Sequence, residues 1–228
     1  MSEPARPVAS GRLLLATRSA GKLRELVPLL TSYGWQAITL VEAGIPEAAC
    51  ESDLEIFSTF EDNALAKARY FCALTGGLVV ADDSGLEVDA LEGRPGVHSK
   101  RWSGRPDLDG AALDAENNVH LQRALAAVPD DASARAARYV CAAAAAWPSG
   151  ECVVRGATAG WIRSFPRGDG GFGYDPYFQS AELGRTFAEV GRDEKAAVSH
   201  RGRAFRALLA RLDAVRAKGD LDEFALPR

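Results

Sequence analysis

The sequence lacks any long apolar run and is poor in cysteine. No stretch approaches the roughly 20 consecutive apolar residues that a helix needs to cross a bilayer, so we expect a soluble, cytoplasmic protein. None of the four cysteines forms a C-x-x-C pair, which argues against a zinc site. A chain of 228 residues can fold without disulfide bonds, so we expect reduced thiols in the core at Cys50, Cys72, Cys141 and Cys152.

The sequence also lacks an excess of basic residues and a dinucleotide-binding glycine motif. A net charge of −4 argues against a surface for nucleic acid or for an anionic membrane, and it disfavours an RNA-binding module. No G-x-G-x-x-G follows the first predicted strand, which disfavours a dinucleotide oxidoreductase. Small molecules are therefore the ligands that the composition leaves open.

Hydrophobic residues make up 47% of the chain, enough for one sizeable core. We expect a single domain of the α/β class over residues 11–220. Residues 1–10, with Pro4 and Pro7 and no apolar core, predict a disordered N-terminal tail, and residues 221–228 predict a C-terminal tail.

Apolar runs predict the strands. Residues 12–16 and 35–40 form two, and residues 77–81 form a central buried strand that ends before a Ser84-Gly85 turn. Residues 86–91 are expected to return beside it as a hairpin arm. The alanines of 134–147 favour a helix, but the Pro148-Ser149-Gly150 turn and the run that follows favour two strands, and 157–165 extends the sheet.

Helical spacing of apolar residues predicts four helices. The first follows Lys22, and the others begin at the caps Ser58, Asp109 and Ser199. The cap at Ser58 is a capping box with Glu61, and that helix is expected to run to Leu74. The inward-facing residues are predicted to be Leu23, Leu26, Val27 and Leu30; Phe60, Ala64 and Phe71; Leu113, Leu121, Leu125 and Val128; and Ala204, Leu208, Leu212 and Val215.

Two adjacent carboxylates, Asp82 and Asp83, end the central apolar strand. Burying such a pair is costly unless a cation, hydrogen-bond donors or a shifted pKa compensates it. Two interpretations remain open from this segment alone: a pair that caps a loop, and a metal site.

Two lysines are candidate phosphate ligands. Residues 17–22, TRSAGK, lie between a predicted strand and a helix, where backbone N–H groups and Lys22 could hold a phosphate. A plain strand-to-helix connection would look similar, because the segment is not a Walker motif. Lys67 lies four residues after Asn63 on a face that leans toward the core, and it either extends its ammonium to solvent or binds phosphate.

Three further segments carry candidate ligands. Residues 46–57, PEAACESDLEIF, predict an irregular acidic loop with Glu47 and Glu51 as possible metal ligands. Residues 166–178, PRGDGGFGYDPYF, predict either a structural corner or a platform where Phe172 stacks on a flat ligand and Asp175 accepts its N–H groups. His200 and Arg201 lie in the first turn of the last helix, where positive charge opposes the helix dipole, so a bound anion or an electron-rich ligand would explain them.

These segments together resemble the noncanonical purine nucleoside triphosphate pyrophosphatases, also called inosine triphosphate pyrophosphatases. The resemblance rests on five collinear segments: LLLATRSAGKLREL (13–26), TFEDNALAKA (59–68), VADDSGLEVDALEGRPGVHSKRWSG (80–104), GFGYDPYF (171–178) and TFAEVGRDEKAAVSHRGRA (186–204). Any one of these segments is weakly specific, whereas five in the same order are strongly so.

The resemblance implies hydrolysis of ITP, dITP or XTP to the monophosphate and pyrophosphate with Mg²⁺, in a cytosolic homodimer. It implies an elongated mixed β-sheet flanked by helices, in two lobes with a central nucleotide cleft. The implied catalytic residues are Asp83 and Lys67, and the implied metal ligands are Asp83 with Glu51 or Glu47. The implied substrate-binding residues are Thr17, Arg18, Ser19, Ala20, Gly21, Lys22, Ser84, Phe172, Gly173, Tyr174, Asp175, Lys195, His200 and Arg201.

The chain departs from the family pattern at two places. Ser19 stands where the family usually has asparagine in T-x-N-x-G-K, and the segment between Pro46 and Thr59 is longer than the usual P-E-x-E-E-T-G-x-T-F. The second departure leaves Glu51, slightly ahead of Glu47, as the expected metal ligand. Two alternatives stay open: a related pyrophosphatase for other modified nucleotides, and a nucleotide-binding regulator without turnover.

Overall fold

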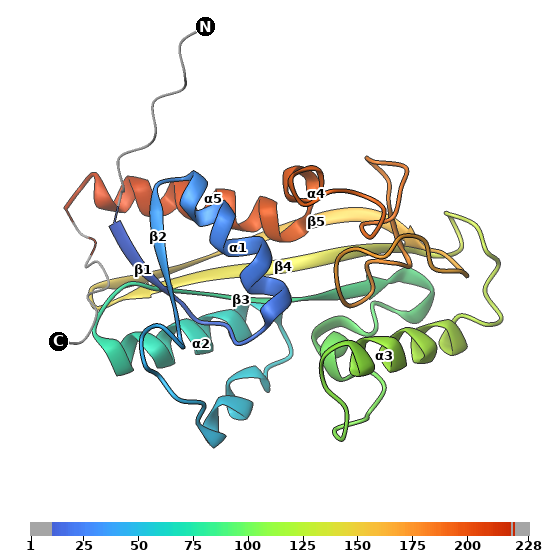
Figure 1. The fold of residues 1–228 in the computed structure, drawn as a ribbon, viewed down its shortest axis with the longest axis horizontal. Coiled ribbons are helices and arrows are strands. Elements are labelled where there is room, and N and C mark those ends of the chain that lie inside the picture. The colour runs from blue at the N-terminus through green and yellow to red at the C-terminus, as the bar shows by residue number, and fades with distance from the viewer. Residues whose placement is uncertain (1–10, 220, 222–228) are drawn as a thin grey trace, which may run out of the picture. The chain divides into compact units, whose positions relative to one another are not determined.

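A computed structural model describes residues 11–219 and 221, so the two predicted tails lie largely outside the described residues. The chain contains a six-stranded sheet with strand order β2-β1-β3-β4-β5-β6. Strand β1 (Gly11–Leu15) is parallel to both β2 (Trp35–Thr39) and β3 (Val79–Val88), whereas β5 (Gly150–Ile162) is antiparallel to β6 (Phe178–Ser180). The sheet is therefore mixed, and the α/β class is confirmed. Figure 1 labels these elements.

The remaining strand, β4, spans Ala136–Trp147, which confirms the strand interpretation of the alanine-rich segment. The α-helices are α1 (Ala20–Ser32), α2 (Phe60–Thr75), α3 (Gly110–Ala124), α4 (Arg192–Val198) and α5 (His200–Arg216). Short 3₁₀ helices are η1 (Ala49–Glu55), η2 (Asp89–Leu91) and η3 (Gly96–Arg101). No helix among the residues that the structure describes has the length and apolarity required to cross a membrane.

Three local predictions were wrong. Strand β3 runs unbroken from Val79 to Val88, so Ser84 and Gly85 form no turn and residues 86–91 form no separate hairpin arm. The cap of α2 is Thr59, whose side chain accepts from the N–H of Asp62, and not Ser58. The acidic loop 46–57 is not irregular throughout, because η1 occupies its middle.

The cysteine prediction holds in part. All four cysteines are free thiols, as expected, but only Cys141 is buried, whereas Cys50 is exposed. A free thiol packs as a small apolar side chain, so the alanine-rich strand β4 accepts Cys141 readily.

The described residues divide into two compact units. The first contains residues 11–83, 142–155, 204–219 and 221, and the second contains residues 84–141 and 156–203. Strands β3, β4 and β5 each contribute to both units, and β3 passes from the first to the second between Asp83 and Ser84. The prediction of a single domain over 11–220 stays a prediction.

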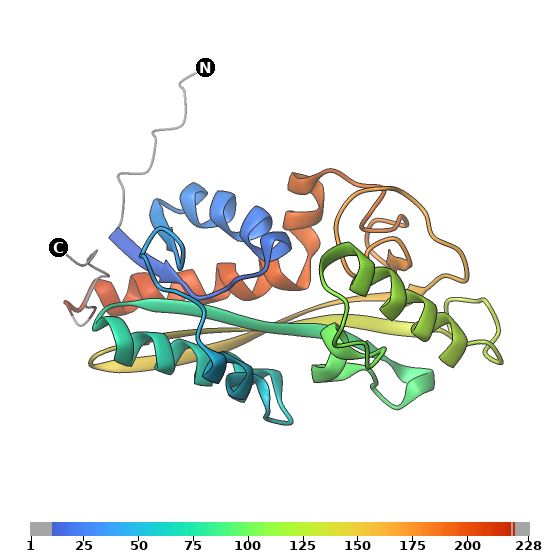
Figure 2. The same ribbon diagram turned by 60° about the horizontal axis from the view of Figure 1, so that its bottom comes forward.

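In the first unit, helices cover both faces of β3. Helix α1 lies on one face and α2 on the other, as both Figures 1 and 2 show. Strand β3 is buried along its whole first half, from Val79 to Asp83. A strand covered on both faces reads as a continuous apolar run, which is why 77–81 was recognisable from the sequence. The predicted stripe of α2, Phe60, Ala64 and Phe71, is buried as expected.

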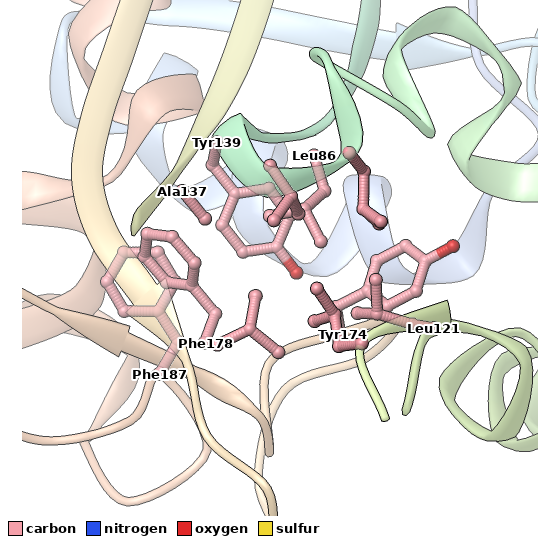
Figure 3. Packing of buried hydrophobic residues seen from close by; sticks show 11 residues of the cluster. Leu86, Leu121, Ala137, Tyr139, Tyr174, Phe178 and Phe187 are labelled. Carbon is pink, nitrogen blue, oxygen red and sulfur yellow. The ribbon is translucent and has the colours of Figure 1, made fainter. Parts of the chain in front are cut away.

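In the second unit, an aromatic cluster forms the core (Figure 3). The ring of Tyr139 on β4 lies 4.6 Å from that of Phe178 and 5.9 Å from that of Phe187, measured between ring centroids. Leu121 and Leu125, which the sequence predicted to face inward, are fully buried in the same cluster. This core supports the segments of the second unit that carry candidate ligands.

Candidate functional site

The parallel pairing of β1 with β3 places the segment 17–22 beside the two aspartates. Leu15 pairs with Val80, and the N–H of Ala16 donates to the carbonyl of Val80 at 2.8 Å. Thr17 and Asp82 each follow two residues after this pair, at the carboxyl end of β1, where its parallel pairing with β3 stops. Such ends are where ligands bind in α/β sheets.

The segment 17–22 forms the N-terminus of α1. Ser19 caps the helix, with its side-chain oxygen accepting from the N–H of Lys22 at 3.4 Å, and the N–H of Ser19 donates to Thr17. Serine in place of the family asparagine therefore keeps the capping oxygen. The free N–H groups of the first turn, which includes Ala20 and the buried Gly21, favour a bound anion.

Arg18 and Glu51 form an ion pair with two hydrogen bonds. The guanidinium of Arg18 donates to both carboxylate oxygens of Glu51, at 2.7 and 2.6 Å, and to the carbonyl of Pro46 at 2.9 Å. The hydrogen bond from Arg18 lowers the pKa of Glu51, against the opposing effect of burial. Glu51 thus joins the acidic segment to the loop after β1, and Glu47 is exposed.

Asp82 is contacted by the ammonium groups of both Lys22 and Lys67. The ammonium of Lys22 lies 3.1 Å from the Asp82 carboxylate, whose side chain is fully buried. The same ammonium donates to the main-chain carbonyl of Asp82 at 3.3 Å, and the ammonium of Lys67 donates to that carbonyl at 2.5 Å. Asp82 therefore brings two positive charges together at the end of β1.

Asp83 faces the opposite side of the strand, toward α2. Its carboxylate accepts from the side-chain amide of Asn63 at 2.9 Å, and Asn63 is fully buried. Burial raises the pKa of Asp83, and the positive charges of Lys67 and Lys22 only partly offset this effect. A carboxylate with a raised pKa is a stronger proton acceptor than an ordinary aspartate, and the two ammonium groups beside it favour its charged form.

Glu55 is a residue that the sequence interpretation missed. Its carboxylate accepts from the ammonium of Lys67, and its side chain is 37% exposed. Burial raises the pKa of Glu55, but the attraction of Lys67 and Lys22 outweighs it, so the pKa is lowered. A usable signal was present in the sequence: Glu55 stands four residues before Thr59, as the last glutamate does in E-T-G-x-T-F.

Asp83 and Glu55 fit a magnesium ion that arrives with a phosphate ligand. In the part of the chain that the structure describes, no group of three or more His, Cys, Asp or Glu side chains could hold a metal by itself. Mg²⁺ takes hard oxygen ligands and commonly binds through one or two carboxylates, with water and substrate phosphates completing its shell. A charged carboxylate that burial penalises, as at Asp83, is stabilised by such a cation.

In the second unit, Asp175 organises the glycine-rich segment. One of its carboxylate oxygens, Oδ2, accepts from the N–H of Phe172 at 2.9 Å and from the ammonium of Lys195 at 2.5 Å. Gly171 is required here, because a Cβ atom at this position would lie 2.1 Å from Oδ2 of Asp175. Asp175 is 2% exposed and is already bonded within the protein. Its predicted contact with ligand N–H groups stays a prediction.

Two cationic side chains, Lys195 and Arg201, lie near the ring of Phe172. The ammonium of Lys195 lies 5.1 Å from the centroid of the Phe172 ring, and the guanidinium carbon of Arg201 lies 5.5 Å from it. Arg201 also donates to the hydroxyl of Ser84 at 2.7 Å. A half-buried aromatic ring flanked by two cations is a suitable contact for an electron-rich heterocycle.

The first turn of α5 is as predicted. Ser199 caps it, with its hydroxyl accepting from the N–H of Gly202 at 3.0 Å. His200 and Arg201 follow and are each 3% exposed. The ring of His200 stacks on that of Tyr139, with centroids 4.5 Å apart and planes 9° apart. Tyr139, Asp114 and Asn118, which contact site residues of the second unit, were not singled out from the sequence.

The predicted site residues thus fall into two groups. The first unit brings together residues 17–22, Lys67 and Asp83, and adds Glu55. The second unit brings together Ser84, residues 172–175, Lys195, His200 and Arg201. The first group consists of charged groups suited to phosphate and metal, and the second combines an aromatic ring with hydrogen-bond donors.

Comparison with known proteins adds an independent observation. The family model described as "Ham1 family" matches residues 13–211. Two similar relatives are named "dITP/XTP pyrophosphatase": one from Nitratidesulfovibrio vulgaris is 49% identical over 86% of this chain and 93% of its own, and one from Mycolicibacterium paratuberculosis is 50% identical over 91% and 98%.

Solved structures agree. A HAM1 protein from Coxiella burnetii aligns with a TM-score of 0.74 and 36% identity, over 89% of this chain and 98% of its own. A nucleoside-triphosphatase described as a dITP/XTP pyrophosphatase, from Mycobacterium abscessus, aligns with a TM-score of 0.65 and 45% identity, over 87% and 98%. With this similarity over nearly its whole length, the chain belongs to the Ham1 family.

Proposed function

We propose that this protein is a Mg²⁺-dependent nucleoside triphosphate pyrophosphohydrolase that converts ITP, dITP and XTP to the monophosphate and pyrophosphate. The observation that carries the proposal is the cluster of Asp83, Lys22 and Lys67, in which a buried carboxylate with a raised pKa lies beside two ammonium groups at a helix N-terminus. The names of the relatives support the choice of substrate. Such an enzyme would remove damaged purines from the nucleotide pool.

In the proposed reaction, Asp83 is the general base. It orients a water molecule toward the α-phosphorus and takes one of its protons as the new P–O bond forms. The bond from the α-phosphorus to the oxygen that bridges to the β-phosphate then breaks, and its electrons leave with pyrophosphate. The raised pKa of Asp83 makes its carboxylate a stronger proton acceptor, which favours this proton transfer.

Lys22 and Lys67 stabilise the negative charge that develops on pyrophosphate, and the N–H groups of the first turn of α1 add to this effect. Lys67 is held at 2.5 Å from the Asp82 carbonyl, so its ammonium is fixed before substrate arrives. Preorganised donors of this kind cost no reorganisation during the reaction.

Asp83 and Glu55 are the residues that would hold Mg²⁺. When bound, the ion would neutralise charge on the triphosphate. This assignment replaces Glu51 and Glu47 with Glu55, because Glu51 is held by both of its oxygens in the contact with Arg18 and Glu47 is exposed.

Selectivity for the base follows from donors in the second unit. Hypoxanthine and xanthine carry a keto oxygen at position six, which His200 and Arg201 can satisfy by donating. Adenine carries an amino group there, and each buried donor left unpaired would cost about 1–3 kcal/mol. Phe172, flanked by Lys195 and Arg201, would stack on the purine. We further propose a cytoplasmic homodimer, as the family resemblance implies.

The experiment that tests the proposal is pyrophosphate release from ITP, dITP, XTP, GTP and ATP, with and without Mg²⁺. The proposal predicts release from the first three substrates, little from ATP, and none without a divalent cation. Equal turnover of ATP would contradict the base assignment. Turnover of modified pyrimidine nucleotides alone would indicate a related pyrophosphatase, and binding without release would indicate a regulator.

A further inference from the structure

The segment 171–175, which carries the proposed contacts to the purine, has no regular secondary structure of its own. Gly171 and Gly173 both have positive φ, +74° and +63°, a region that glycine enters without strain. A glycine-rich segment of this kind can adopt many conformations, so its shape must be fixed by contacts from other elements. The identity of those contacts therefore bears on base recognition.

Two side chains of α3 hold the main chain of Gly173 from both sides. The N–H of Gly173 donates to Oδ2 of Asp114 at 2.8 Å, and the side-chain amide of Asn118 donates to the carbonyl of Gly173 at 2.9 Å. Asp114 and Asn118 are four residues apart, so they lie on the same side of the helix. Together they satisfy both polar main-chain groups of one residue.

The side chains of Asp114 and Asn118 are both largely buried, and both make further hydrogen bonds. Asn118 is 6% exposed, and its amide also donates to the carbonyl of Asp114 at 2.9 Å, which fixes its orientation. The side chain of Asp114 is 18% exposed and also accepts from Lys100 at 3.0 Å. The next residue of the segment, Tyr174, donates its hydroxyl to the carbonyl of Ser99 at 2.7 Å. The segment is therefore tied to both α3 and η3.

Gly173 lies between the two residues whose positions matter most for the proposed base contacts. Phe172 precedes it and has Lys195 and Arg201 against its ring, and Asp175 follows two residues later and bonds Lys195. Rotation of the peptide groups of Gly173 would move both side chains, and with them the ammonium of Lys195. Asp114 and Asn118 touch none of Phe172, Asp175 or Lys195 through any hydrogen bond or ion pair that the structure records, so they would act through the main chain alone.

We propose that Asp114 and Asn118 are positioning residues for the purine: by holding Gly173 they set the place of the Phe172 ring and of Lys195, and thereby the affinity for the base. This inference rests on the proposed function. It assigns a specific role to α3, which contributes none of the residues predicted from the sequence to bind substrate.

The test compares Asn118→Leu with Asn117→Ala, in the full chain. Asn117 is an equally buried neighbour, 2% exposed, that accepts from the N–H of Ser103 and donates to the carbonyl of Lys100, and the structure records no hydrogen bond between it and Gly173. Three quantities are measured with Mg²⁺ present: the KM for dITP, the dissociation constant of α,β-imido-dITP, and the inhibition constant of pyrophosphate. Pyrophosphate lacks the base and reports on the first unit only.

For Asn118→Leu we expect KM and the dissociation constant of the dITP analogue to rise by about 10-fold to 100-fold, as for a misplaced binding group. The inhibition constant of pyrophosphate should stay within about 2-fold of wild type. The substitution weakens binding of the base and leaves the contacts to phosphate in place. Asn117→Ala should lower thermal stability with little change in KM. Hydrogen exchange of the peptide that contains Gly173 should accelerate in Asn118→Leu only.

Asp114→Asn provides a milder variant in case Asn118→Leu folds poorly. It keeps an oxygen acceptor for the N–H of Gly173, so KM should rise less and in the same direction. The inference is overturned if both variants keep wild-type KM, or if dITP and pyrophosphate binding weaken in parallel. A wild-type protein that releases no pyrophosphate from any nucleotide would instead refute the proposed function, and the inference with it.

Discussion

Asp82 and Asp83 are adjacent in β3, yet their carboxylates point to opposite faces of the strand. The Asp82 carboxylate lies 3.1 Å from the ammonium of Lys22 on α1, and the Asp83 carboxylate accepts at 2.9 Å from Asn63 on α2. Alternation along a strand requires this divergence. One aspartate is thus neutralised by an ion pair, whereas the other keeps a raised pKa, and the two should respond differently to the same substitution.

Replacing Asp83 should lower activity and, at high pH, raise stability. Asp83→Asn should lower kcat for dITP by about 10²-fold to 10⁴-fold, the usual contribution of a general base. Because the folded pKa of Asp83 is raised above its ordinary value of 3.8, the folded state binds the proton more tightly than the unfolded chain does. Stability is therefore lost as pH rises through the folded pKa, and the loss is complete above it. Without ligand at pH 8, Asp83→Asn should unfold at higher denaturant concentration than wild type.

Asp82→Asn is the matched control for this substitution. It removes the buried charge that faces Lys22, so the free energy of unfolding should fall by roughly 3 kcal/mol. If Asp83→Asn destabilised the protein as much as Asp82→Asn, Asp83 would be a structural residue and the assignment of the base would be wrong.

Replacing Glu55 tests the revised choice of metal ligand. Glu55→Gln should raise the Mg²⁺ concentration for half-maximal activity by about 10-fold or more, because one of the two proposed carboxylates is lost. The measurement is a Mg²⁺ titration of pyrophosphate release at saturating dITP. Asp53→Asn makes the same change of charge two residues away at an exposed position and should leave the titration unchanged. Equal shifts in both variants would indicate a general effect of charge.

The contact of Arg18 with Glu51 should stabilise the fold in a pH-dependent manner. The hydrogen bond from Arg18 lowers the folded pKa of Glu51 below its ordinary value of 4.5. The stabilisation is therefore complete above pH 4.5 and is lost as pH falls through the folded pKa. Glu51→Gln should cost about 1 kcal/mol of unfolding free energy at pH 7, as is typical of a partly exposed ion pair. Denaturant unfolding from pH 7 to pH 3 should show the gap between Glu51→Gln and wild type closing.

Glu47→Gln removes an exposed carboxylate from the same segment and should change stability by less than about 0.5 kcal/mol at any pH. A gap for Glu51→Gln that did not narrow between pH 7 and pH 3 would contradict the assignment of the stabilisation to the Arg18–Glu51 pair.

Arg135 closes the C-terminal end of α3 and should be important for stability. The residue is 5% exposed, and its guanidinium donates to the carbonyls of Leu125, Val128 and Pro129. Arg135→Leu leaves the buried carbonyl of Leu125 and the partly buried carbonyls of Val128 and Pro129 without the donor, so the free energy of unfolding should fall by about 2–4 kcal/mol. Arg123→Leu removes an exposed arginine from the same helix and should cost less than about 0.5 kcal/mol. Denaturant unfolding of both variants measures the difference, and similar losses would refute the role of Arg135.

The sequence by itself determined most of the elements and the kinds of chemistry present. Apolar runs located β1, β2 and the first half of β3, because strands covered on both faces exclude polar residues, but they did not predict the short strand β6. The apolar stripe of α2 and the cap at Ser199 were readable for the same local reasons. The Ser84-Gly85 turn was wrong because pairing within a sheet overrides the weak local preference of two residues for a turn.

Only the tertiary structure decided which of these residues meet. Spacing along the chain showed three glutamates in one segment but not that Glu51 contacts Arg18 whereas Glu55 contacts Lys67. It gave no sign that Asp114 and Asn118 hold Gly173, more than 50 residues away along the chain, with separations of 59 and 55. Such partners depend on strand register and helix placement, which are set by packing of the whole chain. Residue types are a local property of the sequence, whereas the pairing of charges is a property of the fold.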